Sequence, residues 1–455
     1  MKKACDLRQD PIRSLVIKLA IPSMIAQLVN VLYSIIDRMY IGNIPEVGDI
    51  ALAGAGVCGP IVTLLSSFGT LIGLGGSILM SMRLGEKKKK QAEQILSNSF
   101  LLLIIFSFTL TITFLLIKDE LLVQFGASEV TFRYANTYMT IYTLGTFFAL
   151  LSIGLNYFIT CQGFSIISMT TVLIGAITNI ILDFVFIFVF HAGIAGAAWA
   201  TVIAQMLSCA FAVSFLFGKQ VPIRITFGNY SFPIIKDILS IGLCPFIILA
   251  TDSLIIIIMN AVLQKYGGPA EGDLLISSAT IVQSYMMLIT GPMIGITGGT
   301  QAIISYNYGA ASSTRVKQAE RLILALCLIF TSCMFLVSRI FPIYFVQIFT
   351  REQTLVNLSV WGIKTFTLGI IPLSLQYVFV DGLTALGRTK TALALSIFRK
   401  SSYIAFTLLL PTFFSAKHVF YAEPMSDILS ACITSSVFLL VFSNHLKARE
   451  ISVNQ

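Results

Sequence analysis

Charged side chains are scarce in this chain of 455 residues. Asp, Glu, Lys and Arg together make up only 11% of it, whereas a soluble domain has about 25%. Apolar residues make up 56%, and the mean hydropathy is +0.88. A soluble protein with so few charges could not cover its surface, which excludes an ordinary cytosolic enzyme, a nucleic-acid-binding protein and a disordered chain. The composition indicates a polytopic, helical membrane protein.

Recognisable catalytic and metal-binding motifs are also missing. The three histidines, His191, His418 and His445, share no spacing with cysteines or acids, and there is no Walker loop for ATP. The eight cysteines show no CxxC spacing, and most lie in apolar runs, which is typical of small buried hydrophobic residues. We therefore expect no enzyme and no cofactor, and a membrane-embedded enzyme is the weakest alternative.

Long apolar runs fill the chain instead. A helix needs about 20 largely apolar residues to cross the hydrocarbon core. That rule predicts an all-α protein with twelve transmembrane helices, centred near residues 29, 68, 106, 148, 178, 205, 250, 292, 331, 368, 401 and 435. The runs are unbroken and do not alternate, which excludes the strands of a transmembrane barrel.

The basic residues predict how these helices are oriented. With the N-terminus inside, the inner loops and ends hold 20 Lys and Arg residues and the outer ones hold 7. Cytoplasmic loops carry the excess of Lys and Arg, so we expect both termini in the cytoplasm. The run Lys87–Lys90 is interpreted as a topology anchor, with an anionic-lipid site as the alternative.

An internal repeat predicts two lobes. The separation of Gly85 from Gly309 equals that of Gly163 from Gly387, and the separation of Pro22 from Pro245 differs from it by a single position. Six spans per half give both halves the same orientation, so we expect a pseudo-two-fold axis along the membrane normal. The predicted domains are an N-terminal six-helix lobe (1–218), a cytoplasmic linker (219–234) and a C-terminal six-helix lobe (235–455).

Polar residues inside the first span form one stripe. Gln27, Asn30, Ser34 and Asp37 follow one another at steps of three, four and three, which puts them on one helical face. Polar groups are costly in lipid, so this face should contact protein or water. A snorkelling Asp37 beside Arg38 is the alternative interpretation, and the continuous stripe argues against it.

A second acid lies deep in the fifth span. Asn179 and Asp183 are one turn apart, and mostly apolar residues separate Asp183 from the loop at His191. An ionisable residue within a membrane span is a functional candidate by default. Asp37 and Asp183 both fall in the outer half of the first lobe, so we expect them to share a proton or to bind Na⁺ with Asn179. A structural hydrogen bond between helices is the alternative.

Further polar or adaptable residues line up on other spans. For Asn156 and for Thr201 of the sixth span, packing and function are equally good interpretations, while Asp252 is a second ion site, a structural acid or a substrate-facing acid. The predicted substrate cavity comprises Gln27, Asn30, Ser34, Tyr138, Asn156, Gln205, Asp252, Gln283, Met286 and Met287. Apolar packing is the simpler interpretation of the methionines.

The order of these features resembles the multidrug and toxic compound extrusion (MATE) family. The features are twelve spans in two repeats, the sequence LAIP near the start of the first span, Gly85 and Gly309 after glycine-rich spans, and the segment from Asn156 to Thr201. The chain looks like the DinF-type prokaryotic branch, close to multidrug exporters of Gram-positive bacteria. The resemblance implies two six-helix lobes around a central cavity and antiport of H⁺ or Na⁺ against an organic cation or amphiphile.

Residue by residue, the resemblance implies a cation-coupling site. It assigns that site to Asp37, Asn179, Asp183 and Thr201, which would also hold Na⁺ if Na⁺ is the coupling ion. The second-lobe acids of the other bacterial branch have no matching position, since Asp252 is shifted from one of them. A flippase of lipid-linked precursors is the rival transport function. We expect a multi-pass protein of a prokaryotic plasma membrane that acts as a monomer, with the bilayer and a small molecule as partners and no nucleic acid.

Overall fold

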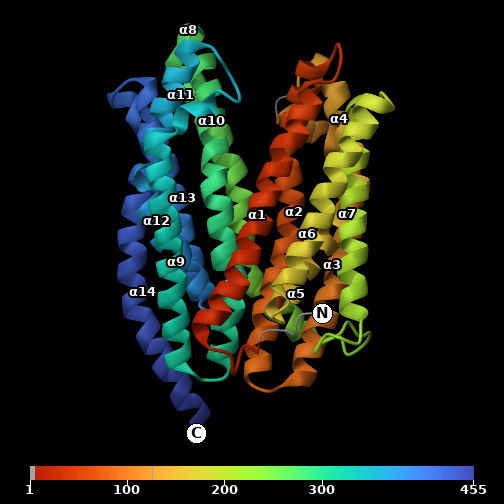
Figure 1. Ribbon diagram of the computed structural model, residues 1–455, viewed down its shortest axis with the longest axis vertical. Helices are drawn as coiled ribbons and strands as arrows, with labels where there is room; N and C mark the ends of the chain where they lie inside the picture. The colour runs from red at the N-terminus through yellow and green to blue at the C-terminus, as the bar shows by residue number, and fades with distance from the viewer. Residues whose placement is uncertain (1–5, 126, 455) are drawn as a thin grey trace. The chain divides into compact units, whose positions relative to one another are not determined.

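The computed structural model describes residues 6–125 and 127–454, and these are almost entirely helical (Figure 1). Helices satisfy their own backbone hydrogen bonds, which long apolar segments require inside a bilayer. The elements, in chain order, are α1 (Ile12–Gly42), α2 (Gly48–Gly85), α3 (Lys89–Gln124), α4 (Glu129–Leu144), α5 (Thr146–Cys161), α6 (Ser165–Phe184), η1 (Val185–Val189), α7 (Gly193–Phe217), α8 (Phe232–Gly309), α9 (Ser313–Ile340), α10 (Pro342–Val346), α11 (Gln353–Phe366), η2 (Thr367–Gly369), α12 (Ile370–Ala385), α13 (Thr389–Phe413), η3 (Ala416–Tyr421) and α14 (Ala422–Asn454).

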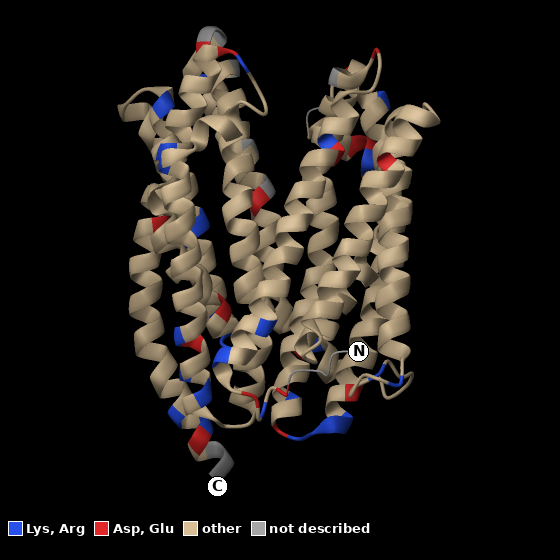
Figure 2. Cartoon of the chain, viewed as in Figure 1, with Lys and Arg blue, Asp and Glu red and all other residues tan. Residues whose placement is uncertain are grey.

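Eleven segments among the described residues are long and apolar enough to cross a membrane. The pair α4 and α5 adds a twelfth if it counts as one span, because it passes the same test with a bend of 56° at Gly145. Charged residues lie mainly toward the helix ends, with only a few along the middle of the helices (Figure 2). The predicted all-α, multi-span fold is therefore confirmed.

Helix α8 joins two of the predicted spans. It runs without a loop from Phe232 to Gly309 and is broken at Gly268, where φ is 63° and ψ is −167°. Its two apolar parts, Phe232–Gly268 and Leu274–Gly309, correspond to the spans predicted near residues 250 and 292. The left-handed φ at Gly268 is readily adopted only by glycine, which explains a reversal without an irregular loop.

The chain forms two compact units. Unit 1 comprises the described part of Met1–Asp10 with Ile25–Leu249, and unit 2 comprises Pro11–Met24 with the described part of Ala250–Gln455. The unit boundaries thus fall just before α1, inside α1 and inside α8, whereas the lobe boundaries predicted from the sequence fall directly after α7 and in the first turn of α8. The two-lobe division remains a prediction, and the first turns of α1 pack with the second half of the chain.

The segment between α7 and α8 belongs to unit 1. Residues 218–231 are irregular, and the backbone nitrogens of Ile223 and Ser231 donate hydrogen bonds to Gln162 Oε1 and Asn98 Oδ1, both at 2.9 Å. Ile223 is fully buried. The segment predicted as a polar linker is therefore fastened to α3 and to the C-terminal end of α5 rather than loose.

The backbone repeats itself at the offset found in the sequence. Gly163 and Gly387 follow α5 and α12 with φ of 86° and 77°, and Lys87 and Ala311 follow α2 and α8 with φ of 61° and 54°. A positive φ is rare for residues other than glycine. The two pairs of left-handed residues have the same separation along the chain, which indicates that the same turns recur in each half.

Close packing of α2 against α5 depends on small residues. A Cβ on Gly73 would lie 2.6 Å from Gly154 Cα and 2.7 Å from Gly154 O. No real Cβ sits that close to backbone atoms, so only glycine allows this approach. The contact joins two helices of unit 1.

Candidate cation-binding site

Asp183 is a fully buried acid near the end of α6. Its exposed fraction is 0%, and neither carboxyl oxygen has a hydrogen-bond partner among the described residues. Directly after Phe184 the helix widens into the π-helical turn η1. Such turns are frequent at functional sites because they redirect the side chains around them. A buried carboxylate without a donor is costly, so the position calls for a proton or a cation.

Asp37 on α1 faces Asp183. The two carboxyl groups lie within interaction range of one another, and Asp37 Oδ1 is buried without a hydrogen-bond partner in the described structure. The basic side chain whose charge acts on Asp37 is its neighbour Arg38. The structure therefore brings together the two acids that the sequence paired, although four helices lie between α1 and α6 in the chain.

Asn179 and Thr201 complete the predicted set. Asn179 Nδ2 donates a hydrogen bond of 3.2 Å to Thr201 Oγ1, which links α6 to α7. Asn179 lies one turn before Asp183, is 2% exposed, and its Oδ1 has no hydrogen-bond partner among the described residues. The Asn179 amide nitrogen donates to Thr201, and Asn179 Oδ1 remains available as an acceptor for another group.

Three tyrosines border the acids, of which only Tyr138 was predicted from the sequence. Tyr33 is close enough for electrostatic interaction with Asp37 and Asp183. The rings of Tyr138 and Tyr142 stack with centroids 6.2 Å apart, and Gln205 Nε2 donates to Tyr142 Oη at 3.5 Å. Tyr33 lies one helical turn before Asp37, and that spacing was the signal that could have identified it.

The donor set fits a proton or an alkali cation. It consists of two carboxyl groups, an amide and a hydroxyl, which are hard oxygen ligands of the kind that bind such ions rather than soft metals. Four of its buried oxygens have no hydrogen-bond partner in the described structure: Asp37 Oδ1, Asn179 Oδ1, Asp183 Oδ1 and Asp183 Oδ2. No group of three or more His, Cys, Asp and Glu residues that could hold a metal ion occurs among the described residues.

The residues predicted for the substrate cavity divide between the units. Unit 1 holds Gln27, Asn30, Ser34, Tyr138, Asn156 and Gln205, and unit 2 holds Asp252, Gln283, Met286 and Met287. Asn30 Nδ2 bonds to Gln27 Oε1 at 3.4 Å, as the shared face predicts. Met286 is buried, whereas Met287 is 52% exposed. Whether these residues form one cavity stays a prediction.

The two bases Arg399 and Lys400 of unit 2 are paired with acids. Arg399 Nη2 bonds to Glu423 Oε1 and Arg399 Nε bonds to Asp427 Oδ1, both at 2.8 Å. Lys400 forms an ion pair with Asp252. Asp427 is buried and lies within the last predicted span, so sequence reasoning could have found it by the rule used for Asp183. Asp252 thus has a basic partner, and Arg399 pairs with two acids of α14.

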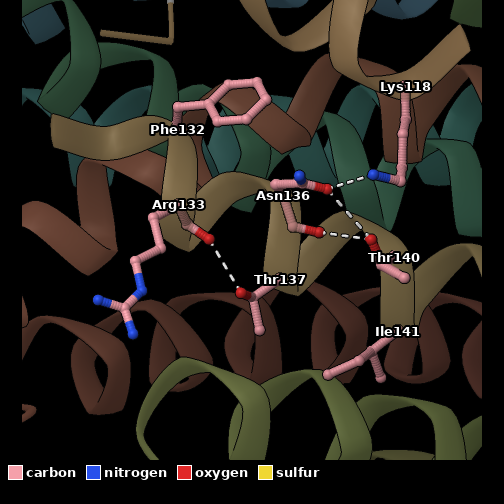
Figure 3. Close-up of a pocket in the computed structure, with 7 residues that line it drawn as sticks. All are labelled: Lys118, Phe132, Arg133, Asn136, Thr137, Thr140 and Ile141. Atoms are coloured by element: carbon pink, nitrogen blue, oxygen red, sulfur yellow. Dashed lines mark hydrogen bonds between the residues drawn. The ribbon is translucent and has the colours of Figure 1, made fainter. Parts of the chain in front are cut away.

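A separate open pocket of about 550 Å³ lies where α3 meets α4 (Figure 3). It is lined by Lys118, Phe132, Arg133, Asn136, Thr137, Thr140 and Ile141. Lys118 Nζ donates to Asn136 Oδ1, and Arg133 points away from that pair. None of the predicted site residues lines this pocket, so it is distinct from the acid pair.

Comparison with known families decides the identity. The MatE family model matches the chain twice, at residues 22–185 and 247–409. The two matches are displaced from one another, at both their starts and their ends, by the offset of the repeat to within a single position. The chain belongs to the MatE family. Its members are the MATE transporters that the sequence resembled, and the doubled match accounts for the backbone turns repeated in the two halves.

Relatives of known name are multidrug export proteins. The MATE chain is 25% identical to the multidrug export protein MepA of Staphylococcus haemolyticus strain JCSC1435 over 92% of its own length and 91% of that protein. It is 23% identical to MepA of Staphylococcus aureus strain NCTC 8325 over 95% of both chains. The predicted similarity to Gram-positive multidrug exporters is confirmed.

Solved structures share the fold of this MATE chain. One is described as the outward-facing conformation of a multidrug resistance MATE family transporter, with a TM-score of 0.91, 21% identity, and 98% and 100% of the two chains covered. Another, from Pyrococcus furiosus, is described as a MOP superfamily transporter with reverse polarity of its binding pocket, with a TM-score of 0.91, 21% identity, and 98% and 99% coverage. These similarities establish the fold.

Proposed function

We propose that this MATE protein is a cation-coupled antiporter that exports organic cations or amphiphilic drugs by alternating access. Its family and its named relatives support multidrug export. The observation that carries the coupling mechanism is the set of four buried, unpartnered oxygens on Asp37, Asn179 and Asp183 in unit 1. H⁺ or Na⁺ is the coupling ion.

The coupling follows from the charges of the site. Two carboxylates in a low-dielectric pocket cannot both stay ionised without a cation, since each disfavours the charge of the other. When a cation arrives, Asp37 of α1 and Asp183 of α6 attract it instead of repelling each other. Asn179 and Thr201 add α7 to the same cluster. The occupied and empty states therefore favour different packing of α1, α6 and α7, and this is the differential interaction that alternating access requires.

The energy available is sufficient. One elementary charge moving across the membrane field releases about 2.3 kcal/mol per 100 mV. The predicted setting is a prokaryotic plasma membrane with both termini in the cytoplasm, as the excess of basic residues in the inner loops suggests. The two lobes predicted at 1–218 and 235–455 would then alternate around the substrate, and a single chain would suffice.

A flippase of lipid-linked precursors has less support. Such a substrate carries a pyrophosphate and needs free basic groups inside the membrane region. The two buried bases, Arg399 and Lys400, are engaged by Glu423, Asp427 and Asp252. Their charges are therefore compensated by acids of the same unit, which favours export of cations over transport of an anionic lipid.

Efflux of a fluorescent organic cation from reconstituted vesicles tests the proposal, with a pH gradient and a Na⁺ gradient imposed separately. Asp183→Asn and Asp37→Asn should each abolish gradient-driven efflux, whereas the matched control Asp119→Asn, an exposed acid of unit 1, should leave it unchanged. The gradient that drives the wild type identifies the ion. If Asp183→Asn pumps at the wild-type rate, the coupling site lies elsewhere.

A further inference from the structure

Unit 2 also contains a buried acid that has no hydrogen-bond partner among the described residues. Glu320 of α9 is 4% exposed, and neither carboxyl oxygen has a hydrogen-bond partner among the described residues. Its side chain lies directly against the backbone of α12, because a Cβ on Gly382 would be 2.5 Å from Glu320 Oε1 and 3.0 Å from Glu320 Cδ. The carboxyl group is thus held against the helical turn that carries Asp381.

Asp381 is the charged group that acts on Glu320. Its own carboxyl faces the side chains of Thr297 and Gln301 on α8, which offer hydrogen-bond donors to it. Gln301 is 2% exposed, and its Oε1 has no hydrogen-bond partner in the described structure. Asp381 of α12 therefore interacts with Glu320 of α9 and with Thr297 and Gln301 of α8.

No basic side chain among the described residues forms an ion pair with Glu320 or Asp381. Cys327 lies within electrostatic range of both carboxyl groups from two turns further along α9. Arg321, next to Glu320 in the chain, is exposed. Among the residues that the structure describes, no ion pair includes Glu320 or Asp381, whereas Arg399 and Lys400 form ion pairs with Glu423, Asp427 and Asp252. Two uncompensated carboxylates at this place would repel each other strongly.

We propose that Glu320 and Asp381 share one bound proton at neutral pH and so form a second protonation site, in unit 2. Protonated Glu320 gains a donor, and the acceptor available to it is the carboxyl group of Asp381. One proton thereby removes one negative charge and gives a partner to oxygens that lack one. Because Glu320 fits closely against Gly382, a proton is favoured over a larger ion.

The shared proton has a structural consequence. When it leaves, two carboxylates remain across the contact between α9 and α12, and their repulsion weakens that contact. Below the pH at which it leaves, the folded protein holds a proton that the unfolded chain releases, so the stability of unit 2 should fall as the pH rises from the ordinary titration range of a carboxyl group, through neutrality, to the point where the shared proton is lost. This inference does not depend on Asp37 and Asp183, which belong to unit 1.

Infrared difference spectroscopy of the purified, full-length protein tests the proposal without any transport measurement. The C=O stretch of a protonated carboxyl group is distinct from the stretch of a carboxylate. The difference between wild type and Glu320→Gln at neutral pH should contain one protonated carboxyl band, which Asp183→Asn and Asp119→Asn retain. Addition of Na⁺ should leave that band in place.

Two spectroscopic outcomes would overturn the inference. Either the difference spectrum of Glu320→Gln contains no protonated band, or Na⁺ removes the band and shows that a metal cation occupies the site. Should Glu320→Gln fail to fold, Asp381→Asn provides the same test through thermal unfolding. The wild type should lose melting temperature as pH rises through neutrality, and Asp381→Asn should flatten that slope. An unchanged slope contradicts a shared proton. Loss of efflux in Asp183→Asn concerns the proposed function alone.

Discussion

The two units contain repeat-related helices but place their ionisable groups differently. At the offset that relates Gly163 to Gly387, Asn179 and Asp183 of α6 correspond to Tyr403 and Thr407 of α13. Unit 1 thus has buried oxygens without partners where unit 2 has a phenol and a hydroxyl. Conversely, α13 carries the paired base Arg399 at the position where α6 has Gly175.

The comparison separates two uses of buried charge. Arg399 with Glu423 and Asp427 is a compensated cluster in which each charge has a partner, so it fixes the packing of α13 against α14. No ion pair among the described residues includes Asp183 or Asp37, so their charge state can change. Paired charges are therefore expected to serve stability in unit 2, whereas unpaired acids serve ion exchange in unit 1.

The largest expected effect is that of replacing Asp183 of unit 1 with threonine, the residue type at the corresponding position Thr407 of unit 2. Asp183→Thr should reduce gradient-driven efflux by more than about tenfold, because the acid that binds the cation is lost along with its coupling energy. The melting temperature in detergent should not fall, since a buried carboxyl without a partner is removed. Vesicle efflux and thermal unfolding measure the two effects. If Asp183→Thr transports at the wild-type rate and has a lower melting temperature, Asp183 serves stability rather than ion exchange.

The next effect concerns the paired cluster. Arg399→Gln leaves Asp427 and Glu423 without their base, and breaking such a buried pair costs about 3–5 kcal/mol. The change should lower the melting temperature in detergent, and Arg399→Gln combined with Asp427→Asn should recover part of it. An Arg399→Gln protein as stable as the wild type would show that the cluster is not structural.

A smaller effect is expected at the close contact between Gly73 of α2 and Gly154 of α5 in unit 1. At the same offset, Gly73 corresponds to Thr297. Gly73→Thr should destabilise the protein by about 1–3 kcal/mol, since its Cβ would overlap the backbone of Gly154. Gly56→Ala is a matched control on α2, because a Cβ there meets no atom within 4 Å. Equal melting temperatures of Gly73→Thr and Gly56→Ala would refute the close contact.

The smallest effect tests the repeated turns. Ala311 has a positive φ of 54°, and the left-handed conformation costs a residue with a Cβ about 1–2 kcal/mol. Ala311→Gly should therefore raise the melting temperature slightly, and Lys87→Gly should do so at the corresponding turn of unit 1. Ala302→Gly inside α8 should lower it, because glycine weakens a helix interior. A lower melting temperature of both Ala311→Gly and Lys87→Gly would contradict the positive φ at these two residues.

Sequence reasoning predicted much of the fold because the relevant signals are local. Apolar run length predicted the spans, and the shared spacing of Gly163 and Gly387 predicted the repeat, since each glycine marks a turn with positive φ. The pairing of Asp37 with Asp183 was also predicted, since polar residues in apolar spans are rare. Tyr33 and Glu320 were not recognised as site residues, because their significance depends on which helices pack against them.

What the sequence by itself determined is the membrane environment, the helical spans and the acids that lie inside them, because hydropathy and charge are properties of the residues themselves. Only the tertiary structure decided which acids form ion pairs with basic side chains. Asp252 looked like a free acid until Lys400 of α13 was placed beside it. The position of Glu320 against α12, which the absence of a side chain on Gly382 allows, is likewise visible only in the tertiary structure. Electrostatic compensation depends on distances between helices, and those distances are fixed by packing rather than by the order of residues.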